Sequence, residues 1–284
     1  MFLVFFMVLL MTVFGNALII VTIKGDVRLH TPMYFFLVNL SFLEICYISI
    51  TIPNILSSLA MQTAMISYAG CMSQVYFFTL CATVECVLLA AMAFDRYVAI
   101  CQPLHYRIII TGRACLCLVS CAWVCAVLSS SINTFLTLRL LYCGANGVSG
   151  LYCEIQPLIR LSCIDTWLND LCDTLAAAVF GVGCVVFIII SYIFILMAIV
   201  KIPHQSRRGK AFSTCASHVT VVILYYGTLI FMYLLPREGS SPQLNMVTSM
   251  IYSMGTPLLN PIIYSLRNEQ VKCALQKTFT WNSS

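Results

Sequence analysis

Two acidic side chains, Glu44 and Glu85, lie inside long apolar segments of the sequence. An ionisable residue in such surroundings is costly and suggests a function. If the two carboxyls face each other, they can share a proton or hold a cation such as sodium, with Asn16 and Asn39 as polar neighbours. The sequence therefore predicts an ion or proton site. The alternative is a protonated, hydrogen-bonded pair that only contributes to packing.

A second charged group is the pair Asp95–Arg96, followed by Tyr97, at the end of an apolar segment. An exposed ion pair contributes less than about 1 kcal/mol, so in one interpretation the pair simply lies at the membrane surface. In the other, Asp95 restrains Arg96 until a signal releases it. An enzyme is not predicted, because the sequence has no Ser/His/Asp set, metal-spaced cluster or phosphate loop, and His218 stands alone.

The composition determines what must position these residues. Of the 284 residues, 61% are hydrophobic and 9% are charged, whereas soluble domains carry about 25% charged residues. No water-soluble fold can hide so much apolar surface, so the lipid bilayer must be the solvent. The formal net charge of +5 does not come from one basic patch, which argues against nucleic-acid binding.

Seven apolar segments are long enough to cross a bilayer, since a spanning helix needs about 20 residues. Backbone groups in hydrocarbon must be bonded within their segment, so each segment is expected to be a helix. The sequence thus predicts an all-α membrane protein, a single seven-transmembrane helix bundle over residues 1–284, with a short cytosolic amphipathic helix at 267–279. The expected spans are 1–23, 32–58, 71–101, 114–138, 168–200, 210–235 and 243–264.

Basic residues set the predicted orientation, because cytosolic loops are rich in Lys and Arg. Twelve of the 15 Lys and Arg residues fall in the loops after the first, third and fifth segments or in the C-terminal tail. Arg139, Arg160 and Arg237 fall on the other side. We therefore expect a multi-pass protein with an extracellular N-terminus. Its opening run shows no basic region or cleavage site of a signal peptide.

Four of the 16 cysteines flank or occupy polar segments on the predicted outer side: Cys71, Cys143, Cys153 and Cys163. An oxidising exterior would favour disulfides among them. Four cysteines allow three pairings, and the residues alone do not choose among these. Free thiols or a zinc site are the alternatives, although the loop at 139–167 holds no histidine.

Five motifs, in order along the chain, resemble those of the olfactory receptors, a family of vertebrate rhodopsin-like G-protein-coupled receptors. The resemblance covers nearly the whole chain, and the long loop at 139–167 is similar to that of the tetrapod-type (class II) branch. The motifs are Leu29-His30-Thr31-Pro32-Met33-Tyr34, Asp95-Arg96-Tyr97-Val98-Ala99-Ile100-Cys101 with Pro103-Leu104-His105-Tyr106, Ser191-Tyr192, Lys210-Ala211-Phe212-Ser213-Thr214-Cys215-Ala216-Ser217-His218, and Pro257-Leu258-Leu259-Asn260-Pro261-Ile262-Ile263-Tyr264.

The resemblance implies a G-protein-coupling switch in which Arg96 is released from Asp95. It also implies a hinge at Asn260-Pro261, because proline lacks the N–H that continues a helix; a static kink is the alternative. The residues of this predicted switch are Asp95, Arg96, Tyr97, Tyr192, His218, Asn260, Pro261 and Tyr264.

Two further features follow from the resemblance. The disulfides it implies are Cys71–Cys153 and Cys143–Cys163. Glu44 stands where rhodopsin-like receptors usually carry an aspartate, which favours an allosteric sodium ion held by Glu44 and Glu85; no other cofactor is expected. Cys273 in the tail is a candidate for palmitoylation, and an unmodified thiol is equally well supported.

A ligand site is expected in the outer half of the bundle, between the third, fifth and sixth helices. On the third helix, the inward face is found by counting back from Arg96 in helical steps. The candidates on all three helices are apolar with a few hydroxyls, as small-molecule pockets usually are. Phe78 stands where receptors of charged amines carry an aspartate, so an amine ligand is not expected. Plain helix packing is almost as well supported for each residue. The candidates are Phe78, Thr79, Ala82, Thr83, Ala177, Phe180, Tyr226, Leu229, Ile230 and Tyr233.

The implied function is that of an odorant receptor in the plasma membrane, in the cilia of olfactory sensory neurons. It would bind a small, mostly apolar volatile molecule and activate a heterotrimeric G protein of the stimulatory olfactory type, raising cAMP. One alternative is a receptor-like chain that folds but traffics or signals poorly, because the first helix, about 34 Å long, begins almost at residue 1. A transporter or channel is a remote alternative, since the sequence holds no inverted repeat.

Overall fold

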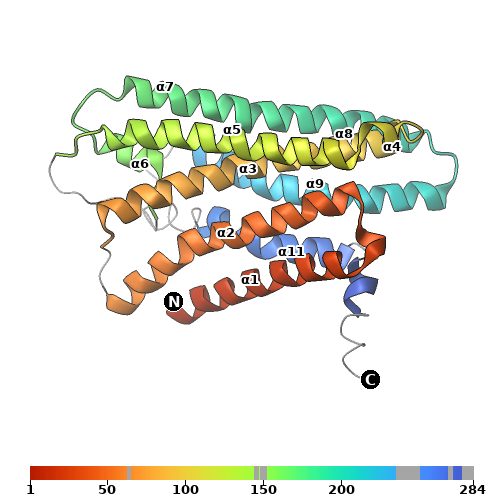
Figure 1. Ribbon diagram of the computed structural model, residues 1–284, viewed down its shortest axis with the longest axis horizontal. Helices are drawn as coiled ribbons and strands as arrows, with labels where there is room; N and C mark the ends of the chain where they lie inside the picture. The colour runs from red at the N-terminus through yellow and green to blue at the C-terminus, as the bar shows by residue number, and fades with distance from the viewer. Residues whose placement is uncertain (63–64, 144–146, 148–151, 235–249, 268–270, 277–284) are drawn as a thin grey trace.

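The computed structural model describes residues 1–284 except 63–64, 144–146, 148–151, 235–249, 268–270 and 277–284. Its long helices run side by side along one axis, with the N-terminus at one end of the bundle and the C-terminal region at the other (Figure 1). We call these the N-terminal end and the opposite end. The long elements are α1 (Phe2–Gly25), α2 (Pro32–Met61), α3 (Tyr68–Cys101), α5 (Gly112–Leu138), α7 (Trp167–Ala176), α8 (Cys184–Val200), α9 (Gln205–Leu234) and α11 (Thr256–Arg267).

Short elements connect or interrupt the long helices. A 3₁₀ turn, η1 (Val27–Leu29), and α4 (Tyr106–Ile109) lie at the opposite end, whereas α6 (Ile155–Arg160) lies at the N-terminal end (Figure 1). Two π-helical segments, η2 (Ala177–Gly183) and η3 (Ile251–Gly255), continue directly into α8 and α11. Residues 271–276 are also helical.

Within the described residues, six helices are long and apolar enough to cross a membrane. The segment formed by η3 and α11 completes the seven-helix bundle, and the first part of the expected seventh span, 243–249, lies outside the described residues. In the expected tail helix at 267–279, positions 268–270 and 277–279 likewise lie outside them. Val271 and Ala274 are buried, so this short helix packs one face on the bundle.

Several helices are longer than the apolar segments that predicted them, which corrects the expected bounds. The predicted starts at 71, 114 and 210 move to Tyr68, Gly112 and Gln205, and the predicted end at 58 moves to Met61. An apolar run marks only the part of a helix that lies in hydrocarbon. The helix itself continues to its capping residue, as at Ser67, whose side chain accepts a 3.1 Å hydrogen bond from the Gly70 N–H.

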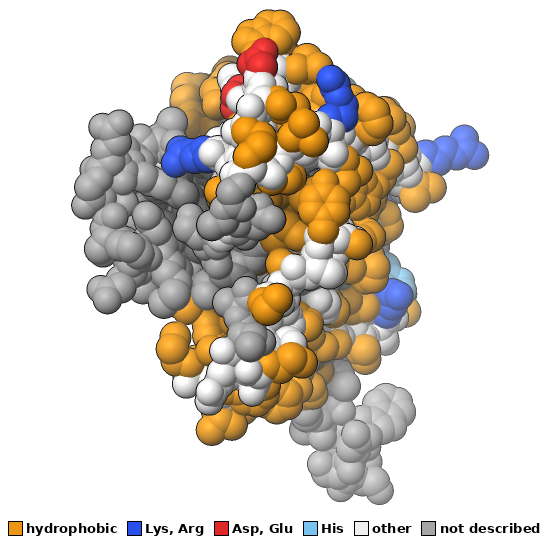
Figure 2. All heavy atoms as spheres, turned by 90° about the vertical axis from the view of Figure 1, so that its left-hand side faces the viewer, with side chains coloured by type: hydrophobic (Ala, Val, Ile, Leu, Met, Phe, Trp, Pro, Cys, Tyr) orange, Lys and Arg blue, Asp and Glu red, His pale blue; other side chains and the backbone are white. Residues whose placement is uncertain are grey.

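The core lies around α3, which contacts α2, α5, α8 and α9. Its Val84, Leu89 and Met92 side chains are fully buried. Many large apolar side chains on the other helices are exposed instead, among them Phe14 of α1 and Ile193 of α8. Such a surface suits a lipid environment and would be unfavourable in water. Figure 2, which looks onto the N-terminal end, shows hydrophobic side chains over much of the described surface, with few charged ones.

Candidate functional site

The Asp95–Arg96 pair lies at the opposite end of the bundle, in the last turns of α3. Arg96 Nη2 is 3.2 Å from Asp95 Oδ2, and the Asp95 side chain is 0% exposed. Tyr106 of α4 donates a 2.7 Å hydrogen bond from its hydroxyl to Asp95 Oδ1. An exposed surface pair is therefore the wrong description, because the carboxylate is enclosed by partners. The Tyr97 ring packs edge-on against the ring of Phe194 in α8 instead, with 6.1 Å between the two ring centroids.

Tyr106 is a functional candidate to which sequence reasoning gave no role. Its place in the Pro103–Tyr106 motif was the only available signal. Burial, followed by the hydrogen bond to the Asp95 carboxylate, raises the pKa of the Tyr106 hydroxyl. The hydroxyl therefore keeps its proton at neutral pH and remains a donor.

His218 connects three helices and lies farther inside the bundle than the Asp95–Arg96 pair. The ring is fully buried in α9; Nε2 lies 3.2 Å from the Leu89 carbonyl of α3, and Nδ1 lies 2.8 Å from the Tyr192 hydroxyl of α8. A carbonyl can only accept, so Nε2 carries the proton and Nδ1 accepts from Tyr192. The lone histidine is thus a connector between α3, α8 and α9.

Tyr264 of α11 is buried near this group. Its hydroxyl has no hydrogen-bond partner within the described part of the chain. It is close enough to Tyr192 and Arg96 to interact with them electrostatically. Five of the predicted switch residues therefore lie near one another: Asp95, Arg96, Tyr192, His218 and Tyr264.

The bend at Pro261 is held by α1. Because Pro261 has no N–H, the carbonyl of Pro257 loses its helical donor. Asn16 Nδ2 donates to that carbonyl at 3.2 Å and to Thr12 O of its own helix at 3.0 Å. Gly15 permits the close approach, since a Cβ at this position would lie 3.2 Å from Pro261 Cβ.

Glu44 and Glu85 are both buried and interact electrostatically. Asn260 Nδ2 donates to Glu44 Oε1, which connects the bend of α11 to this acidic pair. Glu44 Oε2, Glu85 Oε1 and Asn260 Oδ1 are buried acceptors without a hydrogen-bond partner in the described residues. Such oxygens suit a proton or a hard cation. Asn39 does not join them, because its amide donates to Phe35 O of its own helix at 2.8 Å.

The region of the predicted ligand site is an apolar cluster in the N-terminal half of the bundle. Phe78 and Tyr226 are buried in the core, and Ala82, Phe180 and Leu229 pack against it. Thr83 is buried as well, and its hydroxyl donates to the Thr79 carbonyl at 2.9 Å.

Two predicted ligand residues do not line the interior. Ala177 and Ile230 are exposed on the outer surface. Counting in steps of 3.6 residues misplaces Ala177 because the π-helical η2 shifts the register of that helix. Ile230 lies beyond the buried face of α9, which runs through Tyr225 and Tyr226. The side chain of Tyr233 lies outside the described residues.

Aromatic residues that the sequence did not single out complete the cluster. The Phe78 ring lies 5.0 Å from the ring of Tyr47 in α2 and 4.9 Å from that of Tyr152, which precedes Cys153. Tyr225 donates from its hydroxyl to the Ala82 carbonyl at 3.0 Å and contacts Cys86 Sγ at 3.4 Å. Only tertiary packing brings these residues together, since they lie far apart in the sequence.

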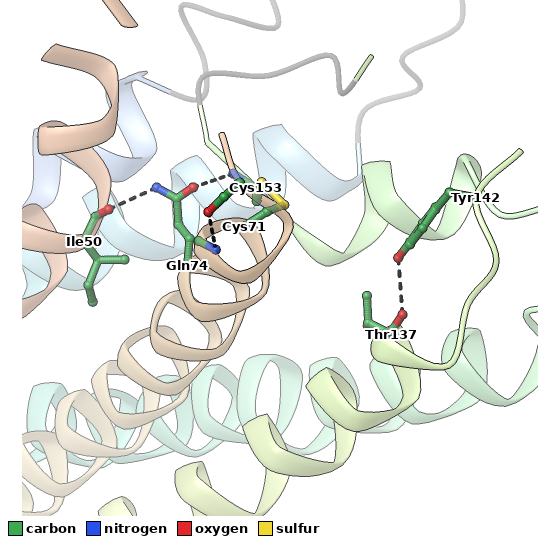
Figure 3. Close-up of a disulfide and its surroundings, with 8 residues drawn as sticks. Ile50, Cys71, Gln74, Thr137, Tyr142 and Cys153 are labelled. Carbon is green, nitrogen blue, oxygen red and sulfur yellow. Dashed lines mark hydrogen bonds between the residues drawn. A yellow bond between two sulfur atoms is a disulfide. The ribbon is translucent and has the colours of Figure 1, made fainter. Parts of the chain in front are cut away.

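Disulfides close the N-terminal end. The structure joins Cys71 to Cys153 and Cys143 to Cys163, which excludes free thiols or zinc at these four positions. Beside them, Tyr142 donates from its hydroxyl to the Thr137 carbonyl at 3.2 Å (Figure 3). A cavity of about 210 Å³ lies nearby between α2 and α3, and it contains none of the ten predicted ligand residues. Its lining is Ile50, Ile66, Gly70, Ser73, Gln74 and Phe77.

Comparison with known proteins decides the family. Residues 5–281 match a protein-family model described as "Olfactory receptor". The chain is 45% identical to olfactory receptor 1G1 of the gorilla over 273 residues, which is 96% of this chain and 87% of that receptor. It is also 45% identical to human olfactory receptor 9Q2 over 280 residues, covering 99% of this chain and 89% of that one.

The chain belongs to the olfactory receptor family.

The fold of this olfactory receptor is that of the rhodopsin-like receptors. The crystal structure of squid rhodopsin aligns with a TM-score of 0.72 at 17% identity, covering 97% of this chain and 83% of that one. The family fixes the coarse function: the chain is a multi-pass membrane protein that receives odorants and couples to G proteins, a signalling receptor and not an enzyme. Within the described residues, no group of three or more His, Cys, Asp or Glu side chains is arranged to hold a metal ion.

Proposed function

We propose that this receptor binds a small, mostly apolar volatile odorant in the N-terminal half of the bundle and activates a G protein of the stimulatory olfactory type, which raises cAMP. The observation that carries the proposal is the cluster around Phe78, where apolar and aromatic side chains meet a few hydroxyls. An uncharged aromatic side chain, Phe78, lies at the centre of this cluster, and Glu85, which interacts electrostatically with Tyr226, is assigned below to the ion site. An uncharged ligand with one polar atom suits such surroundings.

The bundle end that carries Arg96 faces the G protein in this proposal. The N-terminus is then extracellular and the receptor lies in the plasma membrane, in the cilia of olfactory neurons, as a single domain. The asymmetry of Lys and Arg supports this orientation. At rest, Asp95 holds Arg96 and is itself held by Tyr106, while His218 connects α9 to α3. Odorant binding favours a state in which these contacts open and Arg96 meets the G protein.

Expression with a stimulatory olfactory-type G protein, followed by cAMP measurement against an odorant panel, tests this function. Wild type should respond to at least one apolar odorant, and Arg96→Ala should abolish the response at equal surface expression. Arg113→Ala is the matched control, because Arg113 is exposed near the start of α5 and should leave the response intact. A cAMP response that persists in Arg96→Ala would refute the switch.

We further propose that Glu44 and Glu85 hold a sodium ion in the resting state. Three buried acceptor oxygens, on Glu44, Glu85 and Asn260, have no hydrogen-bond partner among the described residues, which supports the ion over simple packing. Replacing sodium by choline should then lower the odorant concentration needed for half-maximal response. Glu85→Gln should make the response insensitive to sodium, and an unchanged sodium dependence in Glu85→Gln would contradict the site.

A further inference from the structure

Gln74 of α3 uses both ends of its amide to join three separate segments. It is a buried side chain one turn after Cys71. Nε2 donates to the Ile50 carbonyl of α2 at 3.0 Å, and Oε1 accepts from the Cys153 N–H at 2.9 Å (Figure 3). A buried amide that binds two backbone groups far apart in the sequence fixes their relative positions.

The first of these partners, the Ile50 carbonyl, lies close to a proline that interrupts the hydrogen bonding of α2. Pro53 is inside this helix, so the Ser49 carbonyl, four residues earlier, has no N–H to accept, and the proline ring pushes against it. The backbone opens at such a bend, and an inserted side chain commonly occupies the gap. Ile50 directly follows Ser49, so Gln74 contacts α2 beside the carbonyl that lacks its helical donor.

The second partner controls an aromatic residue at the ligand site. The N–H that Gln74 holds belongs to the peptide bond between Tyr152 and Cys153. Tyr152 is buried, and its ring lies 4.9 Å from that of Phe78, one turn beyond Gln74 on the same side of α3. The disulfide to Cys71 restrains the side chain of Cys153, whereas Gln74 restrains its backbone and hence the direction in which Tyr152 points.

We propose that Gln74 is a positioning residue for odorant recognition: it holds Tyr152 over Phe78 and links this contact to the Pro53 bend of α2. The inference rests on the proposed function, which puts the odorant beside Phe78. Tyr152 covers the ligand site from the N-terminal end. Gln74 does not touch the ligand, and it acts through the position of Tyr152.

The first test is the odorant response of Gln74→Leu, which keeps the volume but removes both hydrogen bonds. The half-maximal odorant concentration should rise roughly tenfold at equal surface expression, the effect of losing the one buried hydrogen bond that positions Tyr152, and the maximal response should be retained. Gln74→Glu keeps the acceptor for the Cys153 N–H and should give a smaller rise. Ser73→Ala, at the exposed neighbouring position, is the matched control and should match wild type.

A double-mutant cycle separates positioning from general stabilisation. Tyr152→Leu should itself change the half-maximal concentration, and adding Gln74→Leu to it should cause little further change, because both substitutions disturb one contact. Additive effects, or a Gln74→Leu receptor with the wild-type half-maximal concentration, would overturn the proposal.

A measurement without ligand distinguishes failure of this inference from failure of the proposed function. In purified receptor, hydrogen exchange at the Cys153 amide should be faster in Gln74→Leu, which lacks the acceptor for this N–H, than in wild type and in Ser73→Ala. Faster exchange in Gln74→Leu alone supports the restraint, even if no odorant activates the wild type. Equal exchange in all three overturns it.

Discussion

The Tyr106 hydroxyl donates a 2.7 Å hydrogen bond to the Asp95 carboxylate, which is also in contact with Arg96. A short helix outside the membrane spans, α4, thereby holds the acid that restrains the proposed switch. Through Asp95, this contact connects the loop after α3 to Arg96.

Tyr106→Phe removes this donor and keeps the ring. A hydrogen bond to a charged group contributes about 1.5–3 kcal/mol, and the half-buried position of Tyr106 calls for the lower end of that range. Basal cAMP without odorant should therefore rise roughly tenfold at equal surface expression. Tyr142→Phe, at the other end of the bundle, is the control. Basal signalling at the wild-type level in Tyr106→Phe would show that the contact does not restrain the receptor.

Asn16→Leu should destabilise the receptor by about 1–3 kcal/mol, because the Pro257 carbonyl would remain buried without a donor. Thermal unfolding of the detergent-solubilised protein measures this effect as a lower midpoint. The control is Asn39→Leu, since within the described residues the Asn39 amide bonds its own helix and should matter little. Equal midpoints for the two variants would argue against a structural role of the Asn16–Pro257 contact.

The two disulfides should differ in their effect on stability. Cys71–Cys153 spans 82 residues and Cys143–Cys163 spans 20, and the loop-closure entropy removed from the unfolded chain grows with that separation. Replacing Cys71 and Cys153 together by serine should therefore lower the unfolding midpoint more than replacing Cys143 and Cys163, by about 1 kcal/mol in free energy. The opposite order in thermal unfolding would show that local packing outweighs chain entropy.

Alkaline pH should weaken the loop around Tyr142, which lies outside the membrane spans. Burial raises the pKa of its hydroxyl to about 12, against about 10 in an unfolded chain. A raised pKa means that the fold favours the protonated form. The resulting stability is fully present below pH ~10 and is lost as the pH rises through ~12. With free thiols alkylated, the unfolding midpoint should fall between pH ~10 and ~12, and the fall should be smaller in Tyr142→Phe. An identical fall in both proteins would contradict this account.

Much of the fold followed from the sequence because a bilayer leaves few choices. Long apolar runs must be helices, and the positions of Asp95 and Arg96 near the end of one run, or of Asn260 and Pro261 in another, are read directly from the chain. The ends of the helices were less predictable. Capping residues such as Ser67 extend a helix past the apolar run that marks it.

The candidate site was predictable only in part. Periodicity identified Phe78 and Tyr226 as inward-facing, but it failed at Ala177, where a π-helical turn changes the register. It also gave no indication of Tyr47, Tyr152 or Tyr225, because contacts across helices do not appear in the pattern of one helix.

The sequence by itself determined the membrane environment, the helical segments and the residue types available to a switch, because these depend on composition and local spacing. The tertiary structure decided which groups became partners: Tyr106 with Asp95, His218 with Leu89, and Asn16 with Pro257. It also decided that Gln74 spans from Ile50 to Cys153. Each partnership satisfies a buried polar group that water cannot reach, and where that partner lies is set by how the helices pack.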